Sequence, residues 1–241
     1  MFVGVAGLIG VGKSTLTTNL AGELGRRAQI AKHDHPDRQQ PYPDNLARHD
    51  SSILWGARYE PVEENPYLVD FYADIPRWTF NMQMFLLAAR FEQHQEVLWD
   101  KRHRIGGGVV QDRTIYEDTI FARMHREDGL MSDRDWATYI NHFHIMQGFL
   151  RYPDIILYLR VTPDVAMSRI KERGREAEGG MEMSYLERLF EGYEEFAEEM
   201  QRYTVVIPLD WNDYEPVGQV ADKVADAAKR EQKFLRSLRR I

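Results

Sequence analysis

Hydrophobic residues, many of them β-branched, occur in short runs along the chain, and longer stretches with helical periodicity separate most of these runs. The runs cover residues 2–6, 52–59, 108–112, 154–161 and 204–210. The helical patterns lie at about 14–25, 77–99, 132–150, 163–172, 183–202 and 216–236. Short apolar strands that alternate with helices typically form a parallel sheet covered on both faces. We therefore expect an α/β fold with a mainly five-stranded parallel sheet.

One segment, residues 33–50, has neither a helical nor a strand period. It is rich in proline, histidine and aspartate. Such a composition favours an irregular connection. We expect an insertion at about 33–50 within a single domain that spans residues 1–241.

Composition and charge narrow the classes of protein. The 241 residues carry a net charge of −7, which makes general nucleic-acid binding through a basic surface an unfavourable expectation. The chain has no cysteine, so it forms no disulfide and has no thiolate nucleophile, which suits a cytoplasmic protein. No apolar run approaches about 18 residues and the first residues are not basic, so we expect neither a membrane span nor a signal peptide.

The stretch GLIGVGKST has the spacing of a phosphate-binding loop between a strand and a helix. Its glycines allow backbone N–H groups to surround phosphate oxygens, and the following helix adds its positive end. Lys13 would reach the outer phosphates of ATP, and the Ser14 hydroxyl would bind Mg²⁺. The expected ATP-binding residues are Gly7, Leu8, Ile9, Gly10, Val11, Gly12, Lys13, Ser14 and Thr15.

The strand GVVQD ends in Asp112 and is followed by Arg113. A carboxylate there can hold Mg²⁺ or accept a proton, and the guanidinium can neutralise phosphate charge. The chain lacks the N-K-x-D sequence of a guanine-reading switch, and the strand does not end in the Asp-Glu pair of many ATPase motors. Phosphoryl transfer to a bound acceptor is therefore favoured over a guanine-reading switch and over an ATPase motor.

Three arginines lie close together in the stretch SRIKERGREAEGG. Arg169 and Arg173 are four residues apart on one helix face, and Arg175 follows a glycine. Guanidinium groups on a segment that can close would stabilise charge during phosphoryl transfer. We interpret this segment as an arginine-rich lid.

Two further features indicate an acceptor site. Glu60 follows an apolar run and precedes Pro61, which restricts its backbone to extended geometry; an acidic surface turn is the alternative. Gln83 and Arg90 lie two turns apart in the helix at 77–99, which is apolar nearly all round and therefore expected to be buried. The Gln83 amide could bind a base edge and Arg90 could pair with Asp118, although internal core hydrogen bonds would also explain them.

Taken together, these motifs resemble the deoxynucleoside kinases, and especially the bacterial deoxyadenosine/deoxyguanosine kinase branch. The matching pieces are GLIGVGKST, YEPVEENPYLVDFY, the spacing Tyr72–Trp78–Gln83–Arg90, QDRTIYED, DIILYLRV and RIKERGREAE, in family order from residue 1 to about 210. The 33–50 segment has no counterpart. The resemblance implies a P-loop kinase fold, ATP and Mg²⁺ as cofactors, and a homodimer built through long helices.

The resemblance also implies residue roles. It makes Glu60 the general base at the substrate 5′-hydroxyl, with Arg113 nearby and Asp112 tied to Mg²⁺. It places Tyr72 and Glu178 at the 3′-hydroxyl, Gln83 at the base, and the Arg90–Asp118 pair beside the base. Arg169, Arg173 and Arg175 become the lid arginines. Ala177 departs from the family, which often has two adjacent acids there.

We therefore expect an ATP-dependent kinase that phosphorylates the 5′-hydroxyl of a deoxynucleoside, with purines favoured over cytosine. Three alternatives stay open on the sequence. A nucleoside monophosphate kinase of thymidylate-kinase type shares the loop, the Asp-Arg motif and the lid, but Glu60 would repel the phosphate of its acceptor. A regulator that binds nucleotide without catalysis could keep the same fold. A kinase for modified nucleotides or for bases within DNA is the third.

Overall fold

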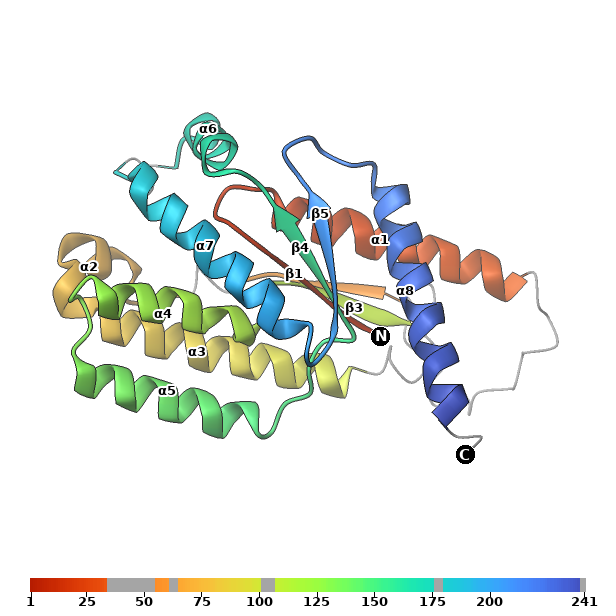
Figure 1. Ribbon diagram of the computed structural model, residues 1–241, viewed down its shortest axis with the longest axis horizontal. Helices are drawn as coiled ribbons and strands as arrows, with labels where there is room; N and C mark the ends of the chain where they lie inside the picture. The colour runs from red at the N-terminus through yellow and green to blue at the C-terminus, as the bar shows by residue number, and fades with distance from the viewer. Residues whose placement is uncertain (34–54, 61–64, 101–106, 176–179, 239–241) are drawn as a thin grey trace.

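The computed structural model describes residues 1–33, 55–60, 65–100, 107–175 and 180–238. Within them, five strands form one parallel sheet in the order β2-β3-β1-β4-β5 (Figure 1). The strands are β1 (Phe2–Gly7), β2 (Trp55–Arg58), β3 (Gly108–Asp112), β4 (Ile155–Arg160) and β5 (Val205–Asp210). β1 and β3 are buried at every position, as a central strand covered on both faces requires. The predicted α/β sheet is confirmed.

The helices cover both faces of this sheet. They are α1 (Lys13–His33), α2 (Leu68–Ala73), α3 (Ile75–Trp99), α4 (Asp118–Glu127), α5 (Asp133–Gln147), α6 (Pro163–Arg173), α7 (Met183–Met200) and α8 (Val217–Leu238), with a short 3₁₀ helix, η3 (Ile115–Glu117), before α4. In Figure 1, α1 and α8 lie together on one side of the sheet, and α3, α4, α5 and α7 lie on the other. No helix among the described residues is long and apolar enough to cross a membrane.

Six of these helices match the predicted ones within a few residues, except that α1 continues to His33. α2 and α4 were not predicted. The predicted insertion at 33–50 lies, apart from His33 at the end of α1, outside the described residues. α3 begins two residues before the prediction because the Asp74 side chain caps it by accepting a hydrogen bond from the Arg77 N–H.

The expectation that α3 is buried all round was wrong. Its buried residues form one stripe, made of Thr79, Met82, Gln83, Leu86, Leu87, Arg90, His94 and Val97. Trp99, at the other extreme, is 77% exposed. Outside the stripe, Phe80, Met84 and Phe91 are partly buried against the core.

The register of the strands brings their carboxyl ends to one edge of the sheet. Val5 of β1 lies beside Asp112 of β3, and Arg58 of β2 lies beside Gln111. The segments that follow these strands carry the loop 7–14, Glu60 and Arg113. Ligands of open parallel sheets bind at this edge, which is where the predicted site residues meet.

Candidate active site

The loop between β1 and α1 has the backbone geometry that its glycines predict. Gly10 and Gly12 have positive φ angles of 79° and 89°. A Cβ atom on Gly10 would also lie 2.5 Å from the Ile170 side chain in α6, so this position excludes any larger residue. α1 begins at Lys13, and the exposed Ser14 and Thr15 lie in its first turn. The open N-terminus of α1 is therefore available to an anion.

Lys13 bends back over this loop. Its Nζ donates hydrogen bonds to the carbonyl oxygens of Gly7 at 3.1 Å and Leu8 at 2.6 Å. Burial, together with the nearby charge of Arg113, lowers the pKa of Lys13 to about 8. A bound phosphate would supply the negative charge that stabilises the ammonium form, so Lys13 is placed to exchange loop carbonyls for phosphate oxygens.

Ser14 and Asp112 meet at the entrance to the loop. The Ser14 hydroxyl donates to Asp112 Oδ2 at 2.5 Å. The other carboxylate oxygen, Oδ1, is buried without a hydrogen-bond partner among the described residues. Mg²⁺ prefers oxygen ligands and keeps several waters, so one hydroxyl and one carboxylate suit it. In the described part of the chain there is no group of three or more His, Asp or Glu residues that could hold a metal by itself.

Arg113 lies at the centre of a buried network. Its φ angle is +60°, the one positive value at a non-glycine residue in the described part of the chain. Its Nε donates to Glu60 Oε2 at 3.0 Å, and its Nη1 contacts the Tyr193 hydroxyl and lies 3.5 Å from Glu117 Oε2. Tyr193 in turn donates to Glu117 Oε2 at 2.9 Å. These contacts hold an unusual backbone conformation, which is typical of functional sites.

Glu60 stands between two arginines. Arg113 binds one of its carboxylate oxygens and Arg90 binds the other. Burial alone would raise the pKa of Glu60, but the charges of Arg113, Arg90 and Lys13 outweigh it and lower the pKa to about 2. Glu60 is ionised at every pH at which the protein would be assayed.

Arg90 joins Glu60 to a second carboxylate. Its Nη1 forms an ion pair with Asp118 at the start of α4, which confirms the predicted pair. Gln83 lies two turns earlier on the same buried stripe of α3 and is 4% exposed. No described residue forms a hydrogen bond with its amide. An amide on this stripe that forms no hydrogen bond with a described residue is suited to a polar ligand edge.

Comparison with known proteins decides the family. A model of the deoxynucleoside kinase family matches residues 3–234. This chain belongs to the deoxynucleoside kinase family. The deoxyadenosine kinase of Dictyostelium discoideum is 35% identical over 99% of this chain and 82% of that protein. The deoxyadenosine/deoxycytidine kinase of Bacillus subtilis (strain 168) is 34% identical over 95% of this chain and 94% of that protein.

The solved structures agree with the sequence relatives. Deoxyadenosine kinase from M. mycoides, with the products dCMP and a flexible dCDP bound, superposes with a TM-score of 0.71 at 27% identity. The match covers 95% of this chain and 100% of that chain. The predicted P-loop kinase fold and the predicted activity, ATP-dependent phosphorylation of a deoxynucleoside, are confirmed. The alternatives of a monophosphate kinase and of a regulator without catalysis lose their support.

Arg169, the first of the predicted lid arginines, lies in α6. Arg169 in α6 donates to the backbone oxygens of Trp211 at 2.9 Å and Asn212 at 2.7 Å, and its guanidinium lies 4.2 Å from the centre of the Tyr214 ring. Arg169 thus contacts the segment between β5 and α8, and its role in ATP binding stays a prediction. Arg173 is exposed in the last turn of α6.

Three other predicted site residues are Arg175, Tyr72 and Glu178. Arg175 follows Gly174, whose φ of 65° ends α6 in a left-handed cap. Tyr72 is 48% exposed near the end of α2. Glu178 lies outside the described residues, as does Pro61.

Several residues that hold this site together were not predicted from the sequence. Tyr193 and Glu117 bind Arg113, as described above. A second set links two strand ends: Gln111 Nε2 donates to the Arg113 carbonyl at 2.8 Å and to Gln93 Oε1 at 3.0 Å, and Gln93 Nε2 donates to the Tyr59 carbonyl at 2.5 Å. Gln111 had a usable signal, because it is a polar residue inside the apolar strand GVVQD. Tyr193 had no such signal, because it lies 80 positions from Arg113 in the sequence.

Proposed function

We propose that this kinase transfers the γ-phosphoryl group of ATP to the 5′-hydroxyl of a purine deoxynucleoside, with deoxyadenosine as the preferred acceptor. The observation that carries the proposal is the position of Glu60. Its ionised carboxylate is joined through Arg113 to the Asp112 side of the phosphate loop and through Arg90 to the helix that bears Gln83. The phosphate donor, ATP, and the acceptor 5′-hydroxyl would therefore meet at Glu60.

On the donor side, the loop residues 7–15 would hold the phosphates, and Lys13 would turn from its loop carbonyls to the outer phosphate oxygens. Ser14 and Asp112 would hold Mg²⁺, which neutralises phosphate charge when bound. Arg113 and the lid residues Arg173 and Arg175 would neutralise further charge as transfer proceeds. The stacking of Arg169 on Tyr214 supports a position for Arg169 beside the adenine ring of ATP.

On the acceptor side, Glu60 would orient the 5′-hydroxyl and receive its proton. Because the pKa of Glu60 is about 2, the carboxylate can take the proton only late, when the bond to phosphorus is already forming. Positioning and charge neutralisation would therefore supply most of the rate. Tyr72 and Glu178 would bind the 3′-hydroxyl, and Gln83 with the Arg90–Asp118 pair would read the base.

The proposed preference for adenine is supported by the names of the sequence relatives and by the Gln83 amide. Both sequence relatives described above act on deoxyadenosine according to their names. The Gln83 amide offers a donor and an acceptor, which matches the adjacent amino group and ring nitrogen of adenine. We infer a purine preference, with deoxycytidine as the nearest competitor.

The test is phosphate transfer from ATP with Mg²⁺ to each of the four deoxynucleosides. The kcat/KM for deoxyadenosine is expected to exceed that for thymidine by about 100-fold or more, because a buried amide left unpaired by the wrong base is costly. Product analysis should find the phosphate on the 5′-oxygen. A kcat/KM for thymidine or deoxycytidine above that for both purines would contradict the preference.

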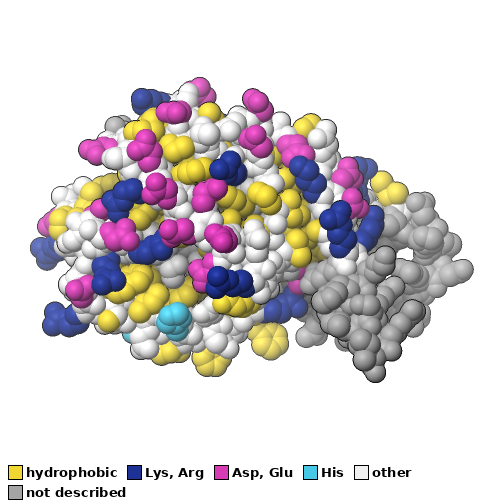
Figure 2. All heavy atoms as spheres, viewed as in Figure 1, with side chains coloured by type: hydrophobic (Ala, Val, Ile, Leu, Met, Phe, Trp, Pro, Cys, Tyr) yellow, Lys and Arg dark blue, Asp and Glu magenta, His cyan; other side chains and the backbone are white. Residues whose placement is uncertain are grey.

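We also propose a homodimer built on α3 and α5. These helices pack side by side (Figure 1). Large hydrophobic residues are exposed at the carboxyl ends of both and just beyond α5, namely Trp99, Ile145 and Phe149. Elsewhere the face seen in Figure 2 has acidic and basic side chains interspersed, with hydrophobic ones between them. Sedimentation velocity is expected to show twice the chain mass, and Ile145→Glu is expected to shift it to one chain. A wild-type monomer at micromolar concentration would contradict the dimer.

We further propose that residues 1–241 form one domain and that the enzyme works in nucleotide salvage in the cytoplasm. The single sheet supports the first point, and the absence of cysteine suits the second. Recovery of the activity in the cytosolic fraction of the source cells would support the location, and recovery in a particulate fraction would contradict it.

A further inference from the structure

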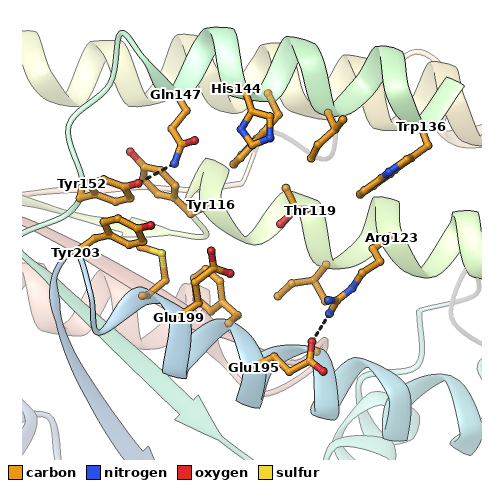
Figure 3. A pocket seen from close by; sticks show the side chains of 16 residues that line it. Tyr116, Thr119, Arg123, Trp136, His144, Gln147, Tyr152, Glu195, Glu199 and Tyr203 are labelled. Carbon is orange, nitrogen blue, oxygen red and sulfur yellow. Dashed lines mark hydrogen bonds and ion pairs between the residues drawn. The ribbon is translucent and has the colours of Figure 1, made fainter. Parts of the chain in front are cut away.

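A cavity of about 410 Å³ lies among α4, α5 and α7 (Figure 3). This volume is within the range of small-molecule sites, and the cavity is formed by the faces of these helices that are turned toward one another. The lining includes none of the residues assigned above to ATP, Mg²⁺ or the deoxynucleoside. It is a second potential binding site on the enzyme.

Aromatic rings dominate one end of the cavity. Tyr116, Tyr152 and Tyr203 stack in sequence, with 4.6 Å between the ring centres of each neighbouring pair. Trp136 and Phe196 add further aromatic surface to the lining. The Tyr116 hydroxyl is buried and has no hydrogen-bond partner among the described residues. Flat ring faces of this kind bind planar apolar groups and attract cations.

The charged residues of the lining are Arg123, Glu195 and Glu199. Arg123 and Glu195 neutralise each other at 2.7 Å, as the dashed line in Figure 3 shows. Glu199 adds a second carboxylate beside the tyrosines, while His144 is the remaining titratable group on the α5 side (Figure 3). The lining therefore carries a net negative charge when His144 is neutral. Nucleotides and other phosphates are repelled by such a lining, whereas amines are attracted.

We propose that this cavity is an effector site for a planar aromatic amine. The ring would lie against the tyrosine stack, and the ammonium group would lie at Glu199. The shape, the aromatic lining and the sign of the charge each point to the same class of ligand, and the inference about binding does not depend on which base the enzyme prefers.

The elements that line the cavity also hold the catalytic arginines. Tyr116 lines the cavity, and the next two residues, Glu117 and Asp118, bind Arg113 and Arg90. On α7, Gly192 lines the cavity, and Tyr193, which follows it, contacts Arg113.

α4 and α7 approach closely at this point. A Cβ atom on Gly192 would lie 2.6 Å from the Ile120 side chain, so the two helices are closely packed at this position. A ligand that occupies the cavity between them acts on the same two helices that position Arg113. Occupancy is therefore coupled to turnover.

The test uses tryptamine as the probe and indole-3-acetate as its anionic match, with the same ring and the opposite charge. Binding is measured by saturation-transfer NMR and calorimetry on the full chain with ATP analogue and deoxyadenosine present, so that the active site is filled. Tryptamine is expected to bind with a Kd of about 1 mM or tighter. Indole-3-acetate is expected to bind at least about tenfold more weakly.

Two variants assign the binding to the cavity. Glu199→Gln is expected to weaken tryptamine about threefold or more, as loss of a partly exposed charge predicts. Glu191→Gln, on the same helix but outside the cavity, is the matched control and is expected to change nothing. Thr119→Trp fills the cavity and is expected to abolish binding. Equal binding of both probes, an unchanged tryptamine Kd in Glu199→Gln, or tryptamine binding that survives in Thr119→Trp, would overturn the site.

The coupling has its own readout. Saturating tryptamine is expected to change kcat of the wild type by at least about fivefold, the lower end of the usual range of coupling between sites. The change should be absent in Thr119→Trp, where kcat is compared with and without tryptamine in the same variant. A kcat that stays constant while tryptamine is bound would overturn the effector role.

Discussion

Replacement of Glu60 by glutamine is expected to lower kcat by about two to four decades, the usual loss when a positioned acid or base is removed. The substitution keeps the size of the side chain and removes both the proton acceptor and the negative charge between Arg90 and Arg113. Glu60→Ala is expected to lose at least as much. The measurement is the rate of ATP-dependent phosphorylation of deoxyadenosine at saturating concentrations of both substrates.

Two controls separate this loss from a general defect. Glu60→Gln should bind ATP with a Kd close to that of the wild type, because Lys13 and the loop 7–15 are intact. Glu92→Gln, an exposed carboxylate on α3, should have normal kcat. Near-normal turnover in Glu60→Gln would refute the assignment of the base and leave Glu60 as the holder of two arginines.

The substitution Arg113→Ala is expected to damage both turnover and stability. It removes the group that contacts Glu60, Tyr193 and Glu117, and leaves the Glu117 carboxylate buried without a cation. Breaking a buried ion pair costs about 3–5 kcal/mol of unfolding free energy. Loss of a group that stabilises transferred charge lowers kcat by about 100-fold to 1000-fold. Urea denaturation and steady-state kinetics measure the two effects.

A double variant distinguishes the two roles of Arg113. Burial already raises the pKa of Glu117, so Glu117→Gln in the Arg113→Ala background should recover part of the lost stability. Turnover should not recover, because the charge of Arg113 is still missing. Arg126→Ala, which breaks an exposed ion pair with Asp133, should cost no more than about 1 kcal/mol. Recovery of turnover in the double variant would make Arg113 a structural residue only.

The sheet and the phosphate loop were predictable because their signals are local. A strand that is buried on both faces gives a continuous apolar run, and a loop that binds phosphate needs glycines at fixed spacing. α2 was missed because it has six residues, none of them buried, so it shows no amphipathic period. α4 has ten residues, so its helical pattern repeats over only a short stretch of sequence. It follows directly on η3, so no separate start signal marks its first residue.

The site was predictable as a set of residues, and less so as an electrostatic environment. Glu60, Arg90, Asp112, Arg113 and Asp118 were named from motifs, and the structure places them at one edge of the sheet with the predicted Arg90–Asp118 pair. The low pKa of Glu60 could not be foreseen, because it arises from cations that three separate segments bring together. The position of Arg169 against Tyr214 likewise depends on a contact between segments that are distant in the sequence.

The most direct test of the account offers the enzyme deoxyadenosine and deoxyadenosine 5′-monophosphate separately, each with ATP and Mg²⁺, and follows the products by ³¹P NMR. The account predicts that deoxyadenosine becomes its 5′-monophosphate and that the monophosphate is not phosphorylated, because the ionised Glu60 carboxylate repels a phosphate at the acceptor position. Conversion of the monophosphate to a diphosphate, with deoxyadenosine left unchanged, would contradict it.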